Sequence, residues 1–185
     1  MKTTENSGST SSPTIGTKVY LETLNIGNNW TDTNVFSNNP SFRYFELEFD
    51  SLMSSTTLDK TLGAFLYWSN GEYDSYNCGG YGADMGGSSQ FGNNNANYMS
   101  LWTPNQYGSS TLGAFGSVRL YFPENGVAFY TAELYAPMAC DTGGAVTIVS
   151  GNYINNDSES CTGIRILFNS GASIIFGQVY VYGCM

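Results

Sequence analysis

The stretch TGIRILFNSGASIIFGQVYVYGC, residues 162–184, alternates apolar and other side chains on both sides of a glycine-containing turn. Ile164 and Ile166 occupy alternate positions before the turn, and Val179 and Val181 do so after it. Period-two alternation is typical of β-strands, and two such runs joined by a short turn predict a β-hairpin. We therefore expect residues 162–184 to form two strands that pair with each other.

Pairing of Phe168 with Ile174 in this hairpin would place Cys161 opposite Val181, with Cys184 three residues further along. That separation is roughly 10 Å at strand rise, which is too long for an unstrained disulfide. A bulge at Gly177 would alter this register. The chain has four cysteines, Cys78, Cys140, Cys161 and Cys184. In a reducing compartment we expect them to be small buried hydrophobes.

The rest of the chain also indicates short strands. Residues 42–52 show the clearest alternation, with Phe45 and Leu47 expected to face inward and Glu46 and Glu48 outward. Further strands are predicted at 17–26, 62–68, 98–102, 117–122, 128–135 and 145–149. About nine strands at this spacing predict an all-β, antiparallel two-sheet sandwich of jelly-roll type. No segment sustains a helical period, so any helix should be a single turn, within residues 51–60.

Composition agrees with one β-rich domain. Apolar residues make up 41% of the 185 residues, which is enough for a core, and the abundant glycine and tyrosine favour turns and strands. Residues 1–16 are polar, rich in serine and threonine and without periodicity. We therefore predict a flexible N-terminal arm at 1–16 and a β-sandwich domain at 17–185.

The charge pattern disfavours two classes of partner. The formal net charge is −9, and the six basic residues are scattered singly. Nucleic acid and anionic membranes are therefore not expected as partners. No apolar window is long enough to cross a bilayer, and the N-terminus lacks the apolar region of a signal peptide. We expect synthesis in a cytoplasm without secretion through a peptide signal.

Residues that carry common chemistry are scarce. The chain has no histidine, no phosphate-binding GxxxxGK[ST] segment and no CxxC pair, so we predict no catalytic residue, no metal site and no cofactor. Glu46 and Glu48 lie two apart on one strand face, a geometry that acid–base catalysis by a glycoside hydrolase could use. Alternating acids on an outer strand face are more commonly solvated charges, so we interpret them that way.

Residues 69–97 are rich in glycine and asparagine and are predicted to form a long loop. Aromatic side chains among small polar residues form an adaptable contact surface. This pattern predicts a protein-contact or glycan-binding surface at Trp68, Tyr73, Tyr76, Tyr81 and Phe91. The alternative is a loop that packs over one end of the sandwich through its tyrosine rings.

The C-terminal stretch also resembles a known family. Its Ile-Arg-Ile strand, glycine turn and Gly-x-x-x-Val-Tyr-Gly ending are carried by Ile164, Arg165, Ile166, Gly171, Gly177, Tyr182 and Gly183. This ending is similar to that of small jelly-roll virion proteins of tailed bacteriophages, found as head decorations, head fibres or tail-associated parts. Cys161 and Cys184 stand where that family usually has aliphatic residues. A looser likeness covers residues 44–76 and 116–123.

The resemblance implies a place in a virion assembled in the host cytoplasm, and it does not imply an enzyme. We expect a capsid decoration or cement protein, a homotrimer that contacts the major capsid protein or other virion proteins. The alternative is a receptor- or carbohydrate-binding module of a tail fibre or tail tip, which would bind a host surface glycan. In that interpretation Trp68, Trp102 and the loop tyrosines would stack on sugar rings. A hydrolase is the third hypothesis.

Overall fold

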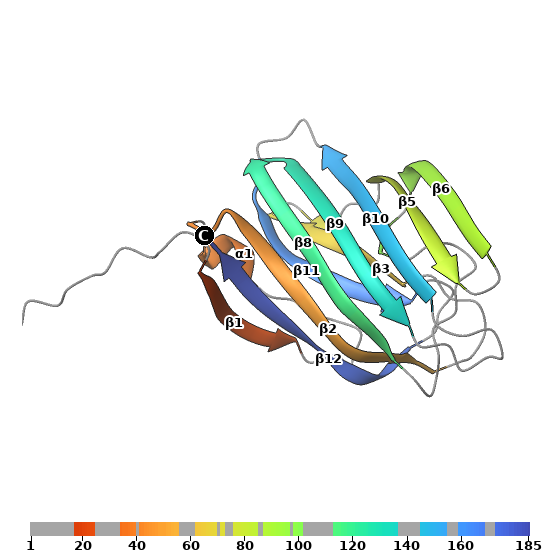
Figure 1. Cartoon of the computed structure of the whole chain (residues 1–185). Helices are drawn as coiled ribbons and strands as arrows, with labels where there is room; N and C mark the ends of the chain where they lie inside the picture. The colour runs from red at the N-terminus through yellow and green to blue at the C-terminus, as the bar shows by residue number, and fades with distance from the viewer. Residues whose placement is uncertain are drawn as a thin grey trace, which may run out of the picture.

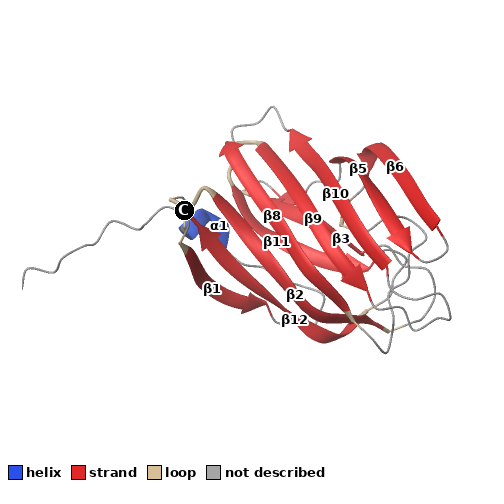
Figure 2. Ribbon diagram, in the orientation of Figure 1, coloured by secondary structure: helices blue, strands red, loops and turns tan. Residues whose placement is uncertain are grey.

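The computed structural model describes residues 17–24, 34–39, 41–55, 62–69, 71–72, 76–84, 87–96, 98–101, 113–136, 145–154, 159–168 and 173–185. The predicted arm at 1–16 lies outside these residues, as do Cys140 and Trp102. The described residues form a sandwich of two antiparallel sheets, which confirms the predicted fold class (Figures 1 and 2). Among them, no helix is both long enough and apolar enough to cross a membrane.

The larger sheet lies in front in Figure 1 and has eight strands. Their spatial order is β1 (Lys18–Leu24), β12 (Ile174–Cys184), β2 (Tyr44–Ser54), β8 (Ala114–Glu124), β9 (Val127–Ala136), β10 (Ala145–Ile154), β5 (Tyr76–Asp84) and β6 (Gly87–Ala96). The smaller sheet contains β11 (Cys161–Phe168), β3 (Leu62–Trp68) and β4 (Gly71–Glu72), and β7 (Met99–Ser100) also pairs with β3.

The predicted hairpin at 162–184 is wrong, because its two strands lie in different sheets. Strand β11 pairs with β3, whereas β12 pairs with β1 and β2. Cys161 therefore lies opposite Trp68, and Val181 lies opposite Leu47. Alternation reports which side chains are buried and not which strand is the neighbour, so two strands that face each other across a core show the same pattern as a hairpin. A register shift does occur beside Gly177.

The core lies between the sheets and is formed by the inward residues of both. In β2, Phe45, Leu47 and Phe49 are buried, as the alternation of residues 42–52 predicts. Ile164 and Ile166 from β11 belong to the same core. Burial of alternate positions from both sheets is the main stabilising feature of a sandwich.

Two buried tyrosines connect the sheets by hydrogen bonds. Tyr130 Oη on β9 donates to the carbonyl oxygen of Ser100 on β7, at 2.8 Å. The backbone N–H of Leu66 on β3 donates to Tyr76 Oη on β5, also at 2.8 Å. Burial is the main cause that raises the pKa of Tyr130, so its hydroxyl stays protonated.

Residues 69–97 do not form the predicted long loop. Their described part contains β4, β5 and β6, and β5 and β6 pair as an antiparallel hairpin at one edge of the larger sheet. A propensity argument misses these strands, because glycine and asparagine are depleted in strands on average. The helical turn also lies elsewhere: α1 spans Val35–Asn38, whereas residues 51–54 are strand and residues 56–60 lie outside the described part.

Three cysteines lie in the described part, and all three are buried free thiols, as expected: Cys78, Cys161 and Cys184. Cys161 lies in the smaller sheet and Cys184 in the larger one. Burial raises the pKa of the Cys161 thiol, which keeps it protonated and unreactive.

Candidate functional site

The surface predicted around residues 68–91 is not assembled as expected. Trp68 is only 3% exposed and Tyr76 is fully buried, so neither ring is available to a partner or a sugar. Tyr81 is 45% exposed and does lie on the surface. Phe91 lies on β6 opposite Gly80, and Tyr73 lies outside the described residues.

Packing explains why these two rings are buried. The Trp68 ring lies 5.1 Å from the ring of Tyr153, which in turn lies 5.4 Å from the ring of Tyr76. The three rings form a contact between β3 of one sheet and β5 and β10 of the other. Large aromatic side chains contribute most to stability when they fill the space between the two sheets of a sandwich.

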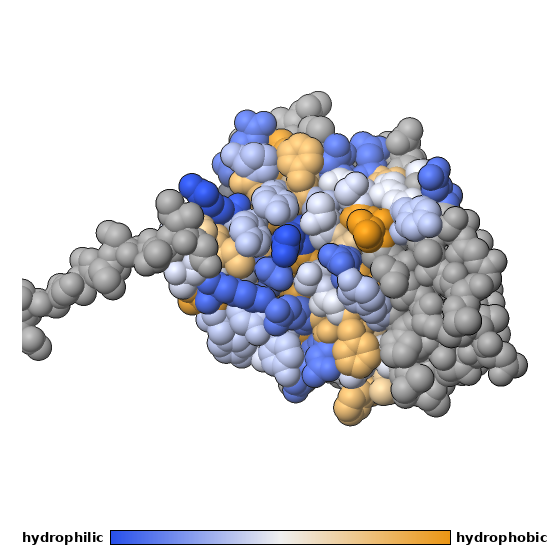
Figure 3. Space-filling view, viewed as in Figure 1, coloured by the Kyte–Doolittle hydropathy of each residue, from blue (hydrophilic) through white to orange (hydrophobic). Residues whose placement is uncertain are grey.

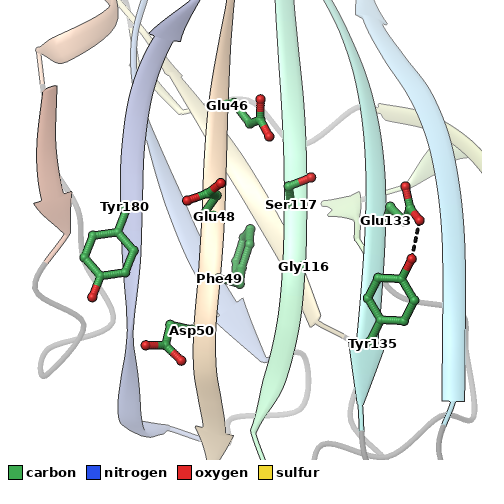
Figure 4. A pocket seen from close by; sticks show the side chains of 9 residues that line it. All are labelled: Glu46, Glu48, Phe49, Asp50, Gly116, Ser117, Glu133, Tyr135 and Tyr180. Carbon is green, nitrogen blue, oxygen red and sulfur yellow. Dashed lines mark hydrogen bonds between the residues drawn. The ribbon is translucent and has the colours of Figure 1, made fainter. Parts of the chain in front are cut away.

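A different surface shows the features of a site: the outer face of the eight-stranded sheet. A shallow cavity of about 540 Å³ crosses β12, β2, β8 and β9 (Figure 4). Three of its carboxylates come from alternate positions of β2, namely Glu46, Glu48 and Asp50, and Glu133 comes from β9. Tyr180 and Tyr135 lie on opposite sides of these carboxylates (Figure 4).

The pairing register brings these residues together. Tyr180 lies opposite Glu48, Glu48 opposite Ser117, and Ser117 opposite Glu133. Directly opposed residues of neighbouring strands share a face, so these side chains form a continuous row across the sheet. Glu48 was identified from the sequence as outward-facing. The other three could have been identified from the alternation of their strands, but that alternation does not show which strands are neighbours.

The row continues onto β10 and β5 with apolar side chains. Ile148 lies opposite Glu133 on one side and opposite Tyr81 on the other, and it is 54% exposed. Tyr135 lies opposite Phe115 in the next row, and both rings are exposed. Figure 3 shows this face as a mixture of hydrophilic residues and separate hydrophobic patches.

Two cations compensate part of the acidic row. Lys18 on β1 forms an ion pair with Glu48 and lies 3.6 Å from Glu46, whereas Arg119 lies 3.7 Å from Glu46 on the other side. The hydrogen bond from Lys18 is the main cause that lowers the pKa of Glu48. Burial acts to lower the pKa of Lys18, but the hydrogen bond to Glu48 and the two carboxylate charges raise it overall.

These charges limit the chemistry that the pair Glu46 and Glu48 can perform. A general acid needs a carboxyl whose pKa is raised, and the shift at Glu48 has the opposite direction. On the other side of the cavity, Tyr135 donates a hydrogen bond to Glu133, and this bond is the main cause that raises the pKa of Tyr135. Among the described residues, no group of three or more acids or cysteines is arranged to hold a metal ion.

Removal of the Lys18 side chain should change the titration of its ion-pair partner, Glu48. We expect the Glu48 carboxyl to titrate below its usual range and to return to that range in Lys18→Gln, followed by ¹³C NMR of the side-chain carboxyl. Because the folded-state pKa is lowered, the ion pair stabilises the fold above the unfolded-state pKa, and this contribution is lost as the pH falls through the folded-state pKa. Arg119→Gln is the control, since Arg119 pairs with Glu46. An unchanged Glu48 titration in Lys18→Gln would contradict the assignment.

The outer face is therefore an exposed row of carboxylates, tyrosines and apolar side chains on a rigid β-sandwich, a surface suited to polar and aromatic contacts. Comparison of the chain with protein-family models, with curated proteins and with solved structures found no match.

Proposed function

We propose that this protein is a non-enzymatic structural component of a tailed-phage virion, a decoration protein that contacts neighbouring capsid subunits through the outer face of its larger sheet. In this proposal it acts in the virion as a homotrimer, with the major capsid protein or another virion protein as its partner. The class of protein comes from the resemblance carried by the C-terminal residues, including Ile164, Arg165, Tyr182 and Gly183.

One structural observation supports the contact surface. Tyr81, Ile148, Phe115 and Tyr135 are exposed on neighbouring strands of one sheet face, beside the carboxylate row. Exposed apolar side chains that gather on one face and are flanked by polar groups are typical of protein interaction surfaces. Tyrosine is also enriched at such interfaces, because its ring is apolar and its hydroxyl forms hydrogen bonds.

The copy number per particle tests the location. Quantitative mass spectrometry of purified source virions should find the protein at hundreds of copies, near the count of the major capsid protein. A handful of copies would contradict capsid decoration and favour the tail or a vertex. Complete absence from virions would overturn the structural role altogether.

A matched pair of substitutions tests the surface. Ile148 and Ile175 are 54% and 57% exposed, but only Ile148 lies directly opposite Glu133 of the carboxylate row. Ile148→Asp should reduce binding to particles that lack this protein by about tenfold or more, because it places a charge within a desolvated contact. Ile175→Asp should bind like the wild type, as measured by co-sedimentation. Equal binding by both variants would contradict the assignment of the contact to the region around Ile148.

The second candidate function is carbohydrate binding, and the cavity in Figure 4 favours it. Tyr180 and Tyr135 lie on either side of carboxylates that could accept hydrogen bonds from sugar hydroxyls. A glycan array with the wild type and with Tyr180→Ala tests this function. Glycan binding that is lost in the variant would favour a receptor-binding module of the tail tip. Absence of binding to any glycan would leave capsid decoration as the proposal.

A further inference from the structure

A second hollow lies on the outer face of the larger sheet, near the turn that joins β8 to β9 (Figure 1). It crosses β8, β9 and β10, and its volume of about 360 Å³ is within the range of small-molecule sites. It shares no lining residue with the cavity in Figure 4. Asn152 in its lining lies four residues along β10 from Ile148, roughly 13 Å at strand rise. The hollow is therefore separate from the acidic cavity and from the contact region around Ile148.

Large and small side chains in neighbouring rows shape this hollow. Phe129 on β9 lies opposite Tyr121 on one side and Asn152 on the other, so these three residues form one row across the sheet. In the next row Thr131 lies opposite Ser150, and both are small and exposed. The hollow therefore lies over the small side chains, beside the larger ones.

An exposed aromatic ring stands at the side of the hollow. Phe129 is exposed on the sheet face, and its neighbour Tyr121 packs against Tyr44 with ring centroids 5.2 Å apart. The face of an aromatic ring carries partial negative charge and attracts polarised C–H groups. Phe129 thus offers a platform to a ligand that has an apolar C–H face.

The polar groups of the lining can both donate and accept hydrogen bonds. They are the hydroxyls of Thr131 and Ser150 and the amide of Asn152. Asn77 on β5 donates to Asn152 Oδ1 at 3.3 Å, which orients this amide. Together these groups match a ligand that carries several hydroxyls.

The charge around the hollow limits the class of ligand. None of the described residues that line it is charged. Arg119 lies opposite Thr131, but its guanidinium pairs with Glu46. The formal net charge of −9 disfavours anions such as phosphates. The lining is therefore suited to a neutral ligand.

Tyr130 supports the hollow from the core side. A Cβ added at Gly151 would lie 2.5 Å from the Tyr130 ring, so this ring packs directly beneath the backbone of β10. The Tyr130 hydroxyl donates to the carbonyl oxygen of Ser100 at 2.8 Å, which ties the ring to the smaller sheet. A site held in this way loses little conformational freedom when a ligand binds.

We propose that this hollow binds one ring of a neutral oligosaccharide. The C–H face of the sugar packs against Phe129, and its hydroxyls exchange hydrogen bonds with Thr131, Ser150 and Asn152. A saccharide uses both parts of the lining, because its ring has an apolar face and its edge carries hydroxyls. Ser150 lies opposite Gly79, which has no side chain to close the hollow toward β5, so the rest of the glycan can extend over that strand. The proposal needs no place in a virion, and it assigns carbohydrate binding to a different site from the cavity in Figure 4.

Cellotetraose is the probe that tests the site, because it is neutral and unbranched and its flat chain exposes C–H faces. Titration of the purified protein should shift the backbone amide resonances of Thr131 and Ser150 in ¹H–¹⁵N spectra saturably, with a Kd below about 1 mM. Tetragalacturonate, which carries a carboxylate on every ring, should bind about tenfold more weakly or worse. Equal affinity for the two saccharides would overturn the assignment of a neutral ligand.

Three variants make the test specific. Phe129→Ala should weaken cellotetraose binding about tenfold, because the stacking platform is lost. Phe115→Ala is the matched control and should bind like the wild type, since Phe115 is also exposed on this sheet but does not line the hollow. Ser150→Leu fills the hollow from an exposed position and should abolish binding without changing a core residue.

Three further results would overturn the proposal. The first is an absence of shifts at Thr131 and Ser150 in about 10 mM cellotetraose, ten times the expected upper limit of Kd. The second is unchanged binding in Ser150→Leu. The third is binding that is lost in Tyr180→Ala and kept in Phe129→Ala, which would place the sugar in the cavity of Figure 4.

Discussion

Alanine in place of Gly116 is expected to lower the free energy of unfolding by roughly 3 kcal/mol or more. Gly116 on β8 has a φ of +133°, a conformation that side chains with a Cβ rarely adopt. An added Cβ would also lie 2.1 Å from the carbonyl oxygen of Glu133 on the neighbouring strand. Backbone atoms of a paired strand cannot move aside without breaking the ladder, so the strain remains in the folded state.

Urea unfolding followed by circular dichroism measures this effect, and Gly92→Ala is the matched control. Gly92 also lies in a strand of the larger sheet, but an added Cβ there meets no atom within 4 Å. The control should change the stability by less than about 0.5 kcal/mol. Equal stability of the two variants would contradict the backbone geometry at Gly116.

Removal of the Tyr76 ring should have the second large effect. Tyr76→Ala is expected to lower the free energy of unfolding by about 3–5 kcal/mol, because it leaves a cavity between the sheets. Tyr76→Phe keeps the ring and loses the acceptor of the Leu66 N–H, so we expect a loss of about 1–3 kcal/mol. Denaturant unfolding of both variants separates the packing contribution from the hydrogen bond.

Tyr81→Ala is the control for this pair, because Tyr81 lies on the same strand but is exposed. Its stability should stay within about 0.5 kcal/mol of the wild type. A larger loss in Tyr81→Ala than in Tyr76→Ala would reverse the assignment of core and surface on β5.

The sequence predicts which side chains are buried better than it predicts which strands pair with each other. Phe45 and Leu47 face inward and Glu48 faces outward, as their alternation indicates, because one face of a strand in a sandwich must be apolar. The partner of a strand depends on contacts between residues far apart in the chain, which local patterns do not encode. For this reason the alternation alone predicts that β11 and β12 pair, although they lie in opposite sheets.

The same limit applies to the candidate sites. Trp68 belongs to the candidate surface because its ring could stack on a sugar in the glycan-binding alternative, whereas the ring is buried and packs against Tyr153 from a distant strand. Glu46 and Glu48 could be assigned to an outer face from β2 alone. The two cations that pair with them, Lys18 and Arg119, could not be identified from the sequence. They come from β1 and β8, and the order of strands in the sheet brings them close to the carboxylates.

The position of β12 between β1 and β2 has a consequence for synthesis on the ribosome. Among the described residues, β1 pairs with β12 and no other strand, and β2 pairs with β12 on one side, so neither pairing can form before β12 has been made. Their ladder cannot form until residues 174–184 have emerged, and this part of the sheet must therefore be completed after translation has passed them. Until then the edges of β1 and β2 that later pair with β12 carry unpaired backbone groups, and such edges are prone to pair with other chains.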